Sequence, residues 1–245
     1  MPSLRSNLAI TNYTGRLFSR ARKVHGIDEQ RDWFLTEFTF KGILFDLDGT
    51  LVNSIAAVDR AWRTWSVEFG LDPEVIAPQI HGRRAKDSIS ALAPHLDQIA
   101  AFNRLEYLEA SDTEGVIPMP GAIDFLARLN EVPWGIVTSG TRAIALPRLR
   151  AAGIEPPKVF VTAEQIVRGK PDPEAFERGA ELLQIAPSDL LAFEDTIAGV
   201  QSAKSAGMSV VALTEEASAH ADAFISDFSV MSLNRSSDNF HIKLA

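Results

Sequence analysis

Short apolar runs alternate along this chain with segments of helical length, and this alternation restricts the fold more than any other feature. The apolar runs occupy residues 42–45, 134–137, 159–161, 190–193 and 209–213. Continuous apolar runs are typical of strands buried on both faces of a parallel sheet. Helices are predicted between these runs, over residues 122–130, 143–152, 173–183 and 196–206. The pattern predicts an α/β domain with a five-stranded parallel sheet.

One stretch interrupts the alternation. Residues 55–119 contain helical segments, such as 56–69 and 96–111, and no convincing strand. We therefore expect an all-helical domain inserted after the first strand, with the core domain formed by residues 41–54 and 120–245. Trp62 and Trp65 lie three residues apart on the first inserted helix and are expected to pack in its interior.

The N-terminus has a separate composition. Its first 27 residues carry five basic and no acidic side chains, whereas the whole chain has a formal net charge of −8. This composition resembles a weak organellar transit peptide, but a solvated basic tail is the simpler interpretation. We assign residues 1–40 to a basic N-terminal extension.

Composition excludes several classes of protein. An acidic chain is repelled by a phosphate backbone, so nucleic acid is not expected as a partner. The absence of Cys rules out thiolate nucleophiles, thiolate-bound zinc and disulfides, and is compatible with a reducing compartment. No apolar run approaches the roughly 18 residues that span a membrane. We expect a cytoplasmic protein that is a monomer or a weak homodimer.

Polar side chains follow the predicted strands, where an open parallel sheet binds its ligands. Acidic, hydroxyl and basic residues occur there in four places, namely Asp46 with Asp48, Thr138 with Ser139, Lys170, and Glu194 with Asp195. Each alone could be a turn, a helix cap or a solvated side chain. Together they indicate one site, because clustered carboxylates require a hard cation such as Mg²⁺. A phosphate would occupy the hydroxyl, the backbone N–H groups and the lysine beside that cation.

These motifs, in this order, resemble the four signature motifs of the haloacid dehalogenase superfamily of phosphohydrolases. The likeness covers roughly residues 41–233 and implies a Rossmann-like parallel sheet core with an inserted all-helical cap domain. Within the superfamily the chain looks most similar to sugar-phosphate and polyol-phosphate phosphatases, including 2-deoxyglucose-6-phosphatases and glycerol-3-phosphatases. The segments that favour this subgroup are Ile80-His81-Gly82, Thr113-Glu114-Gly115, Pro120-Gly121-Ala122 and Val137-Thr138-Ser139-Gly140.

The resemblance implies a role for each motif residue. Asp46 would attack phosphorus to give an aspartyl-phosphate. Asp48 would protonate the leaving oxygen and then deprotonate the attacking water. Thr138 and the Ser139 N–H would hold the phosphoryl oxygens, while Lys170 offsets developing charge.

The resemblance also implies a metal site. Asp46, the backbone carbonyl of Asp48 and Asp195 would bind Mg²⁺ directly, and Glu194 would bind it through water.

Substrate choice is expected to lie in the cap. His81, Arg83, Arg84 and Lys86 form its concentrated polar cluster, which could equally be a solvated basic helix face. Our hypothesis is that His81, Arg83 and Lys86 bind the substrate and that Glu114 lies at the junction of cap and core.

Two positions depart from related proteins. Asn53 stands where many relatives carry an acid, and Ala85 stands where the related β-phosphoglucomutases carry an arginine that holds a second phosphate. The mutase interpretation is weakened accordingly. Because haloacid dehalogenases proper lack the acid/base aspartate, Asp48 also disfavours carbon–halogen cleavage.

The sequence therefore predicts a Mg²⁺-dependent phosphoric monoester hydrolase that acts on small phosphorylated sugars or polyols. Two alternatives stay open: a β-phosphoglucomutase-like phosphotransferase, and a sugar-phosphate-binding module without catalysis. The acid/base residue Asp48 favours catalysis, since a binding module has no need of it.

Overall fold

The computed structural model describes residues 37–236 and 239–244. A six-stranded parallel sheet has the order β6-β5-β2-β7-β8-β9. Its strands are β2 (Gly42–Phe45), β5 (Trp134–Val137), β6 (Val159–Val161), β7 (Leu190–Glu194), β8 (Ser209–Ala212) and β9 (Ala223–Phe224). The five predicted strands are confirmed, and the short β9 extends the sheet beyond β8. Because β2 lies between β5 and β7, the residues that follow these three strands are neighbours.

Helices and hydrophobic clusters cover both faces of this sheet. The helices are α5 (Ala122–Ala127), α6 (Arg142–Ala151), α7 (Glu174–Leu183), α8 (Ile197–Ser205) and α9 (Glu215–Ser218), with short 3₁₀ turns at η2 (Ala163–Gln165) and η3 (Pro187–Asp189). Along β2, Ile43 and Phe45 enter one apolar cluster and Leu44 enters the other. Successive side chains of a strand point to opposite faces, so a strand covered on both sides must be apolar at every position.

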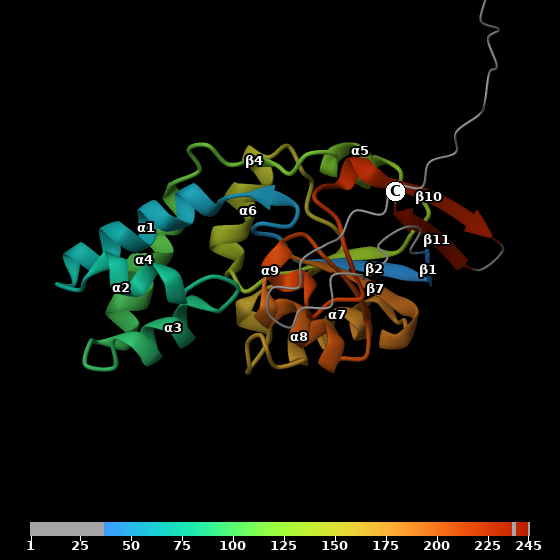
Figure 1. Ribbon diagram of the computed structural model, residues 1–245. Helices are drawn as coiled ribbons and strands as arrows, with labels where there is room; N and C mark the ends of the chain where they lie inside the picture. The colour runs from blue at the N-terminus through green and yellow to red at the C-terminus, as the bar shows by residue number, and fades with distance from the viewer. Residues whose placement is uncertain (1–36, 237–238, 245) are drawn as a thin grey trace, which may run out of the picture. The chain divides into compact units, whose positions relative to one another are not determined.

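Residues between β2 and β5 form a group of helices with an apolar core of its own. They are α1 (Ile55–Glu68), α2 (Pro73–Ile76), η1 (Ala77–Gln79), α3 (Ala85–Leu92) and α4 (Gln98–Ser111), and they gather to the left in Figure 1. Trp62 and Trp65 pack against each other in this core, as predicted, and the Trp65 indole donates to the Ala101 carbonyl at 2.9 Å.

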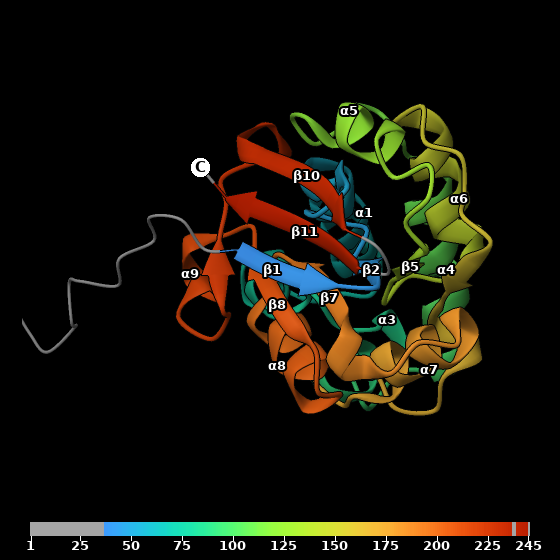
Figure 2. The same ribbon diagram turned by 90° about the vertical axis from the view of Figure 1, so that its right-hand side faces the viewer.

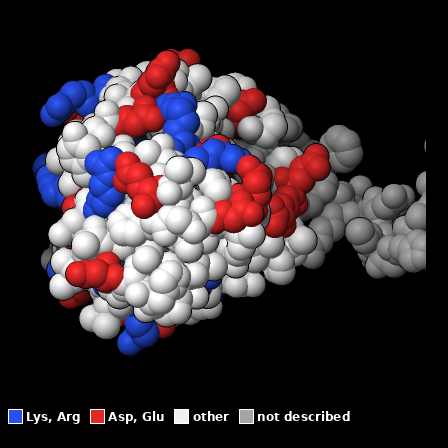
Figure 3. Space-filling model, turned by 90° about the vertical axis from the view of Figure 1, so that its left-hand side faces the viewer, with Lys and Arg blue, Asp and Glu red and all other residues white. Residues whose placement is uncertain are grey.

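A short antiparallel ribbon joins this helical group to the sheet. Strand β3 (Val52–Asn53) precedes the helices and pairs with β4 (Ile117–Pro118), which follows them. The chain therefore enters and leaves the helical group at one place. The face of this group in Figure 3 carries acidic and basic side chains next to one another, and its ion pairs include Arg63 with Glu74 and Arg104 with Glu68.

A second sheet corrects the expected boundary of the core. Strands β1 (Glu37–Phe40), β10 (Met231–Ser236) and β11 (Asn239–Leu244) pair antiparallel in the order β1-β11-β10, with η4 (Phe228–Val230) before β10 (Figure 2). Phe40, Phe240 and Ile242 join the apolar cluster on one face of the large sheet. Residues 37–40, assigned above to the N-terminal extension, thus belong to the core. The rest of that predicted extension, up to residue 36, lies outside the described residues.

Among the residues that the structure describes, no helix combines the length and the apolar character required to cross a membrane.

Candidate active site

Residues at the carboxyl ends of β2, β5 and β7 converge on one buried lysine. Lys170, in the loop before α7, donates from Nζ to Asp46 Oδ1 at 2.5 Å, to Glu194 Oε1 at 2.5 Å and to the Val137 carbonyl at 3.1 Å. Asp46 continues the pairing of β2, because its N–H donates to the Phe193 carbonyl. Four sequence motifs that are far apart in the chain therefore meet at the carboxyl edge of the sheet.

Local hydrogen bonds hold the lysine loop and the acidic turn in place. The Glu174 carboxylate accepts from the N–H groups of Val167 and Arg168, which fixes the loop that carries Lys170. Glu194 Oε2 accepts from the N–H groups of Asp195 and Thr196 at 3.1 and 3.2 Å. With Lys170 on its other oxygen, Glu194 is held by the protein at both ends of its carboxylate.

The site carries more negative than positive charge. Burial raises the pKa of Asp46 to about 8, where Lys170 opposes the rise and Glu194 adds to it. Burial and the neighbouring Asp46 and Glu194 also raise the pKa of Asp195. Although burial works against its charge, Asp46 and Glu194 raise the pKa of Lys170 above its ordinary value. One cation thus faces three carboxyl groups, which favours a further cation beside them.

Three carboxylates are arranged to accept that cation. Asp46, Glu194 and Asp195 each offer an oxygen within 4.8 Å of the others. Asp195 Oδ1 is buried and accepts no hydrogen bond within the described residues. Gly49 has φ +84°, and a Cβ there would lie 2.0 Å from Asp195 Oδ2, so a glycine is needed beside this carboxylate. An all-oxygen donor set of this kind fits a hard cation such as Mg²⁺.

Asp48 lies next to this group in a different environment. Its Oδ1 accepts from the Ser54 hydroxyl at 2.5 Å and from Arg148 Nη1 at 2.9 Å. Ser54 immediately precedes α1, and Arg148 belongs to α6. Neither partner belongs to a sequence motif that predicts the site, and the same is true of Glu109, which accepts from Arg148 Nη2 at 2.7 Å.

Thr138 and Ser139 occupy the end of β5 as expected, and their hydroxyls have different partners. Thr138 Oγ1 accepts from the N–H of Gly140 at 3.0 Å. The Ser139 hydroxyl donates to the Gly82 carbonyl at 3.0 Å, which links the end of β5 to the loop before α3.

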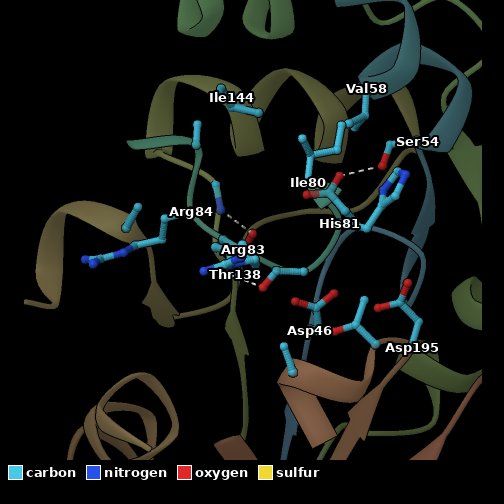
Figure 4. Close-up of a pocket in the computed structure, with 18 of the residues that line it drawn as sticks. Asp46, Ser54, Val58, Ile80, His81, Arg83, Arg84, Thr138, Ile144 and Asp195 are labelled. Carbon is cyan, nitrogen blue, oxygen red and sulfur yellow. Dashed lines mark hydrogen bonds between the residues drawn. The ribbon is translucent and has the colours of Figure 1, made fainter. Parts of the chain in front are cut away.

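A cavity of about 730 Å³ lies over Asp46 and Asp195. In Figure 4, Asp46, Asp195 and Thr138 lie on one side, and Val58, Ile80 and His81 lie across from them. Further lining residues include Asp48, Ser139, Trp62, Phe102 and Ile144, together with Arg83 and Lys86. Lys170 and Glu194 are not among the lining residues and lie behind Asp46. The wall thus combines the carboxyl groups at its floor with apolar and basic side chains of the helical group.

Glu114 is separated from the other residues predicted in the cap. It lies between α4 and β4, where the helical group joins the core, but its side chain is exposed and it is absent from the cavity wall. Its carbonyl accepts from Arg60, and its N–H donates to Asp112, so this segment is held to α1 instead. His81, Arg83 and Lys86 do line the cavity.

Comparisons with known proteins agree with this arrangement. The family model described as "haloacid dehalogenase-like hydrolase" matches residues 40–207 of this chain. Hexitol phosphatase A of Escherichia coli is 48% identical over 182 residues, which cover 72% of this chain and 84% of that protein. The 2-deoxyglucose-6-phosphate phosphatase 1 of Saccharomyces cerevisiae is 30% identical, with 84% of this chain and 95% of that protein covered.

A solved structure extends the likeness to the fold. CbbY from Rhodobacter sphaeroides, crystallised with phosphate, superposes with a TM-score of 0.70 at 22% identity, covering 78% of this chain and 95% of that one. The sequence match spans more than half of the chain, and the sheet order, the inserted helices and the buried acidic cluster are consistent with it. This chain belongs to the haloacid dehalogenase-like hydrolase family.

Proposed function

We propose that this protein is a Mg²⁺-dependent phosphatase that hydrolyses small phosphorylated sugars or polyols through an aspartyl-phosphate on Asp46. The observation that carries the proposal is the convergence of Asp46, Lys170, Glu194 and Asp195 under one cavity. The similarity to a hexitol phosphatase and to a 2-deoxyglucose-6-phosphate phosphatase supports the substrate class.

In the first half-reaction, the phosphate ester binds in the cavity and Asp46 attacks its phosphorus. The hydrogen bonds within the described residues engage only Oδ1 of Asp46, so Oδ2 is the oxygen available for attack. The bond between phosphorus and the sugar oxygen breaks, and Asp48 gives that oxygen a proton. Thr138 and the Ser139 N–H bind phosphoryl oxygens, while Lys170 balances charge from behind Asp46.

In the second half-reaction, water attacks the aspartyl-phosphate. Asp48, now ionised, takes a proton from this water, and the bond between Asp46 and phosphorus breaks to release inorganic phosphate. Each half-reaction returns Asp48 to the state that the other one requires, so a single carboxyl group serves both.

Magnesium would be held by Asp46, Asp195 and the Asp48 backbone carbonyl. Glu194 already accepts hydrogen bonds at both oxygens, which suits the water-mediated contact proposed for it. When bound, the ion would supply the positive charge that the three carboxyl groups and an anionic phosphate together lack.

Removing the metal should abolish activity. With hexitol phosphate, 2-deoxyglucose 6-phosphate and glycerol phosphate as substrates, EDTA should lower phosphate release by about 100-fold or more. Excess Mg²⁺ should restore the original rate, since the protein ligands stay in place. A rate that EDTA leaves unchanged would contradict the assignment of the acidic cluster as a metal site.

The exposed side chains of His81, Arg83 and Lys86 line the cavity from the helical group, so we propose that α1–α4 act as the cap that selects the leaving group. Arg83→Ala and Lys86→Ala should change the ratio of kcat/KM between two substrates of the panel by about 10-fold, the effect of losing a hydrogen bond to a charged group. Lys158→Ala, at an exposed position outside the cavity wall, is the matched control. Identical ratios in wild type and both variants would remove these residues from substrate selection.

The mutase alternative has less support. Ala85 lines the cavity and offers no charged group to a second phosphate. The neighbouring Arg84 is buried, where it pairs with Asp87 at 2.7 Å and donates to the Ile166 carbonyl at 3.1 Å. Conversion of β-glucose 1-phosphate to the 6-phosphate, measured beside phosphate release, distinguishes the two activities.

A further inference from the structure

A buried arginine joins the catalytic loop to the helical group. The Arg148 side chain on α6 is 2% exposed, and Nη1 and Nη2 donate to Asp48 and Glu109 at 2.9 and 2.7 Å. The Glu109 side chain, on α4, is 8% exposed. Arg148 therefore holds Asp48 with one nitrogen and an inserted helix with the other.

These charges stand on helix faces that are otherwise apolar. Arg148 follows the buried Ile144 by four residues on α6, and Glu109 follows the buried Leu105 by four residues on α4. Packing alone would be satisfied there by apolar side chains, which often stabilise a protein as well as a buried ion pair does. A charged pair at these two positions thus calls for an explanation beyond stability.

The contact with Asp48 supplies that explanation. Arg148 Nη1 and the Ser54 hydroxyl both donate to Oδ1 of Asp48. Because Oδ1 accepts both of these hydrogen bonds and Oδ2 accepts none within the described residues, Oδ2 is the oxygen that remains to carry the acidic proton and give it to the leaving oxygen. Because the guanidinium is planar and held at both ends, it fixes the orientation of the Asp48 carboxyl.

We propose that Arg148 is a positioning residue that presents Oδ2 of Asp48 to the leaving oxygen, and that Glu109 orients Arg148. Proton transfer is thereby linked to the placement of α4 in the helical group. This inference rests on the proposed phosphatase function, in which Asp48 is the acid and base.

The test compares two leaving groups. The alkoxide of a hexitol phosphate needs a proton to depart, whereas p-nitrophenolate leaves without one. Arg148→Met alone would strand the buried Glu109 charge, so Arg148→Met is combined with Glu109→Leu to remove both charges at similar volume. Circular dichroism and thermal unfolding test whether this double variant is folded.

For hexitol phosphate, the double variant should lose about 100-fold in kcat, the usual size of general acid catalysis, while KM changes by less than about 3-fold. With p-nitrophenyl phosphate, the first turnover should release p-nitrophenol within about 3-fold of the wild-type rate, followed by slow turnover because the second half-reaction also needs Asp48. Asp48→Asn should give the same pattern. Arg150→Met, an identical change at an exposed position of α6, should match wild type.

Two results would overturn the inference. One is a folded double variant that hydrolyses hexitol phosphate at the wild-type rate. The other is an equal loss in the first turnover of both substrates, which indicates a purely structural role. Failure of the proposed function gives a different signature, since the wild-type protein would then release phosphate from neither substrate.

Discussion

Asp46→Asn should eliminate phosphate release, with a loss in kcat on the order of 10⁵-fold or more, as is typical when a nucleophile is removed. An amide oxygen attacks phosphorus far more weakly than a carboxylate does. The asparagine side chain has almost the same shape and still offers an oxygen to Lys170, so the fold should be retained. The variant also removes one of the crowded carboxyl groups, and its thermal unfolding midpoint in EDTA should equal or exceed that of wild type.

Acid quenching with a radiolabelled substrate measures this directly. Wild-type protein should carry phosphate on Asp46 during turnover, and the variant should carry none. Asp189→Asn is the matched control, because Asp189 precedes β7 at the opposite end of that strand and, within the described residues, forms an ion pair only with the exposed Lys41. Retention of more than about 1% of wild-type activity in Asp46→Asn would exclude an aspartyl-phosphate on this residue.

Lys170→Met should damage both catalysis and stability. Loss of the ammonium removes the charge behind the phosphoryl site and should slow kcat by roughly 100- to 1,000-fold, or about 3 to 4 kcal/mol in the barrier. It also leaves the buried carboxyl groups of Asp46 and Glu194 without their shared partner. Stranding buried charge in this way should lower the free energy of unfolding in EDTA by about 3 to 5 kcal/mol.

Urea unfolding with EDTA and with Mg²⁺ separates these contributions. Bound Mg²⁺ should return part of the lost stability, because it binds only the folded protein. Lys204→Met is the control, since its pair with Asp222 is solvent-exposed and should contribute less than about 1 kcal/mol. A similarly small loss in Lys170→Met would show that the buried lysine is not the partner on which the two carboxyl groups depend.

Strand-end residues could be predicted because their position follows from the topology. A continuous apolar run such as residues 42–45 indicates a central parallel strand, and adjacent parallel strands end at one edge. Asp46, Thr138 and Glu194 are therefore expected at one edge, and the structure places Lys170 between Asp46 and Glu194. Residues 55–119 interrupt the alternation of strands and helices, and this interruption predicted the inserted helices.

Other features depended on contacts between distant segments. Strand β1 pairs with β11 about two hundred residues later, so no local pattern tied residues 37–40 to the core. Glu114 looked like part of a site because it belongs to a motif, yet its backbone turns toward Arg60 and its side chain faces solvent. Arg148 and Glu109 each follow a buried apolar residue by four positions on a helix. This spacing places a charge on an apolar face but does not predict which residue it contacts.

By itself, the sequence determined the parallel sheet, the inserted helices and the acidic cluster, because these follow from local periodicity and from the common edge of neighbouring strands. Tertiary structure alone decided which side chains orient Asp48 and which ones form the cavity wall. That choice depends on how α4 packs against α6, and packing between helices is set by side-chain shape across the whole interface, which no short stretch of sequence contains.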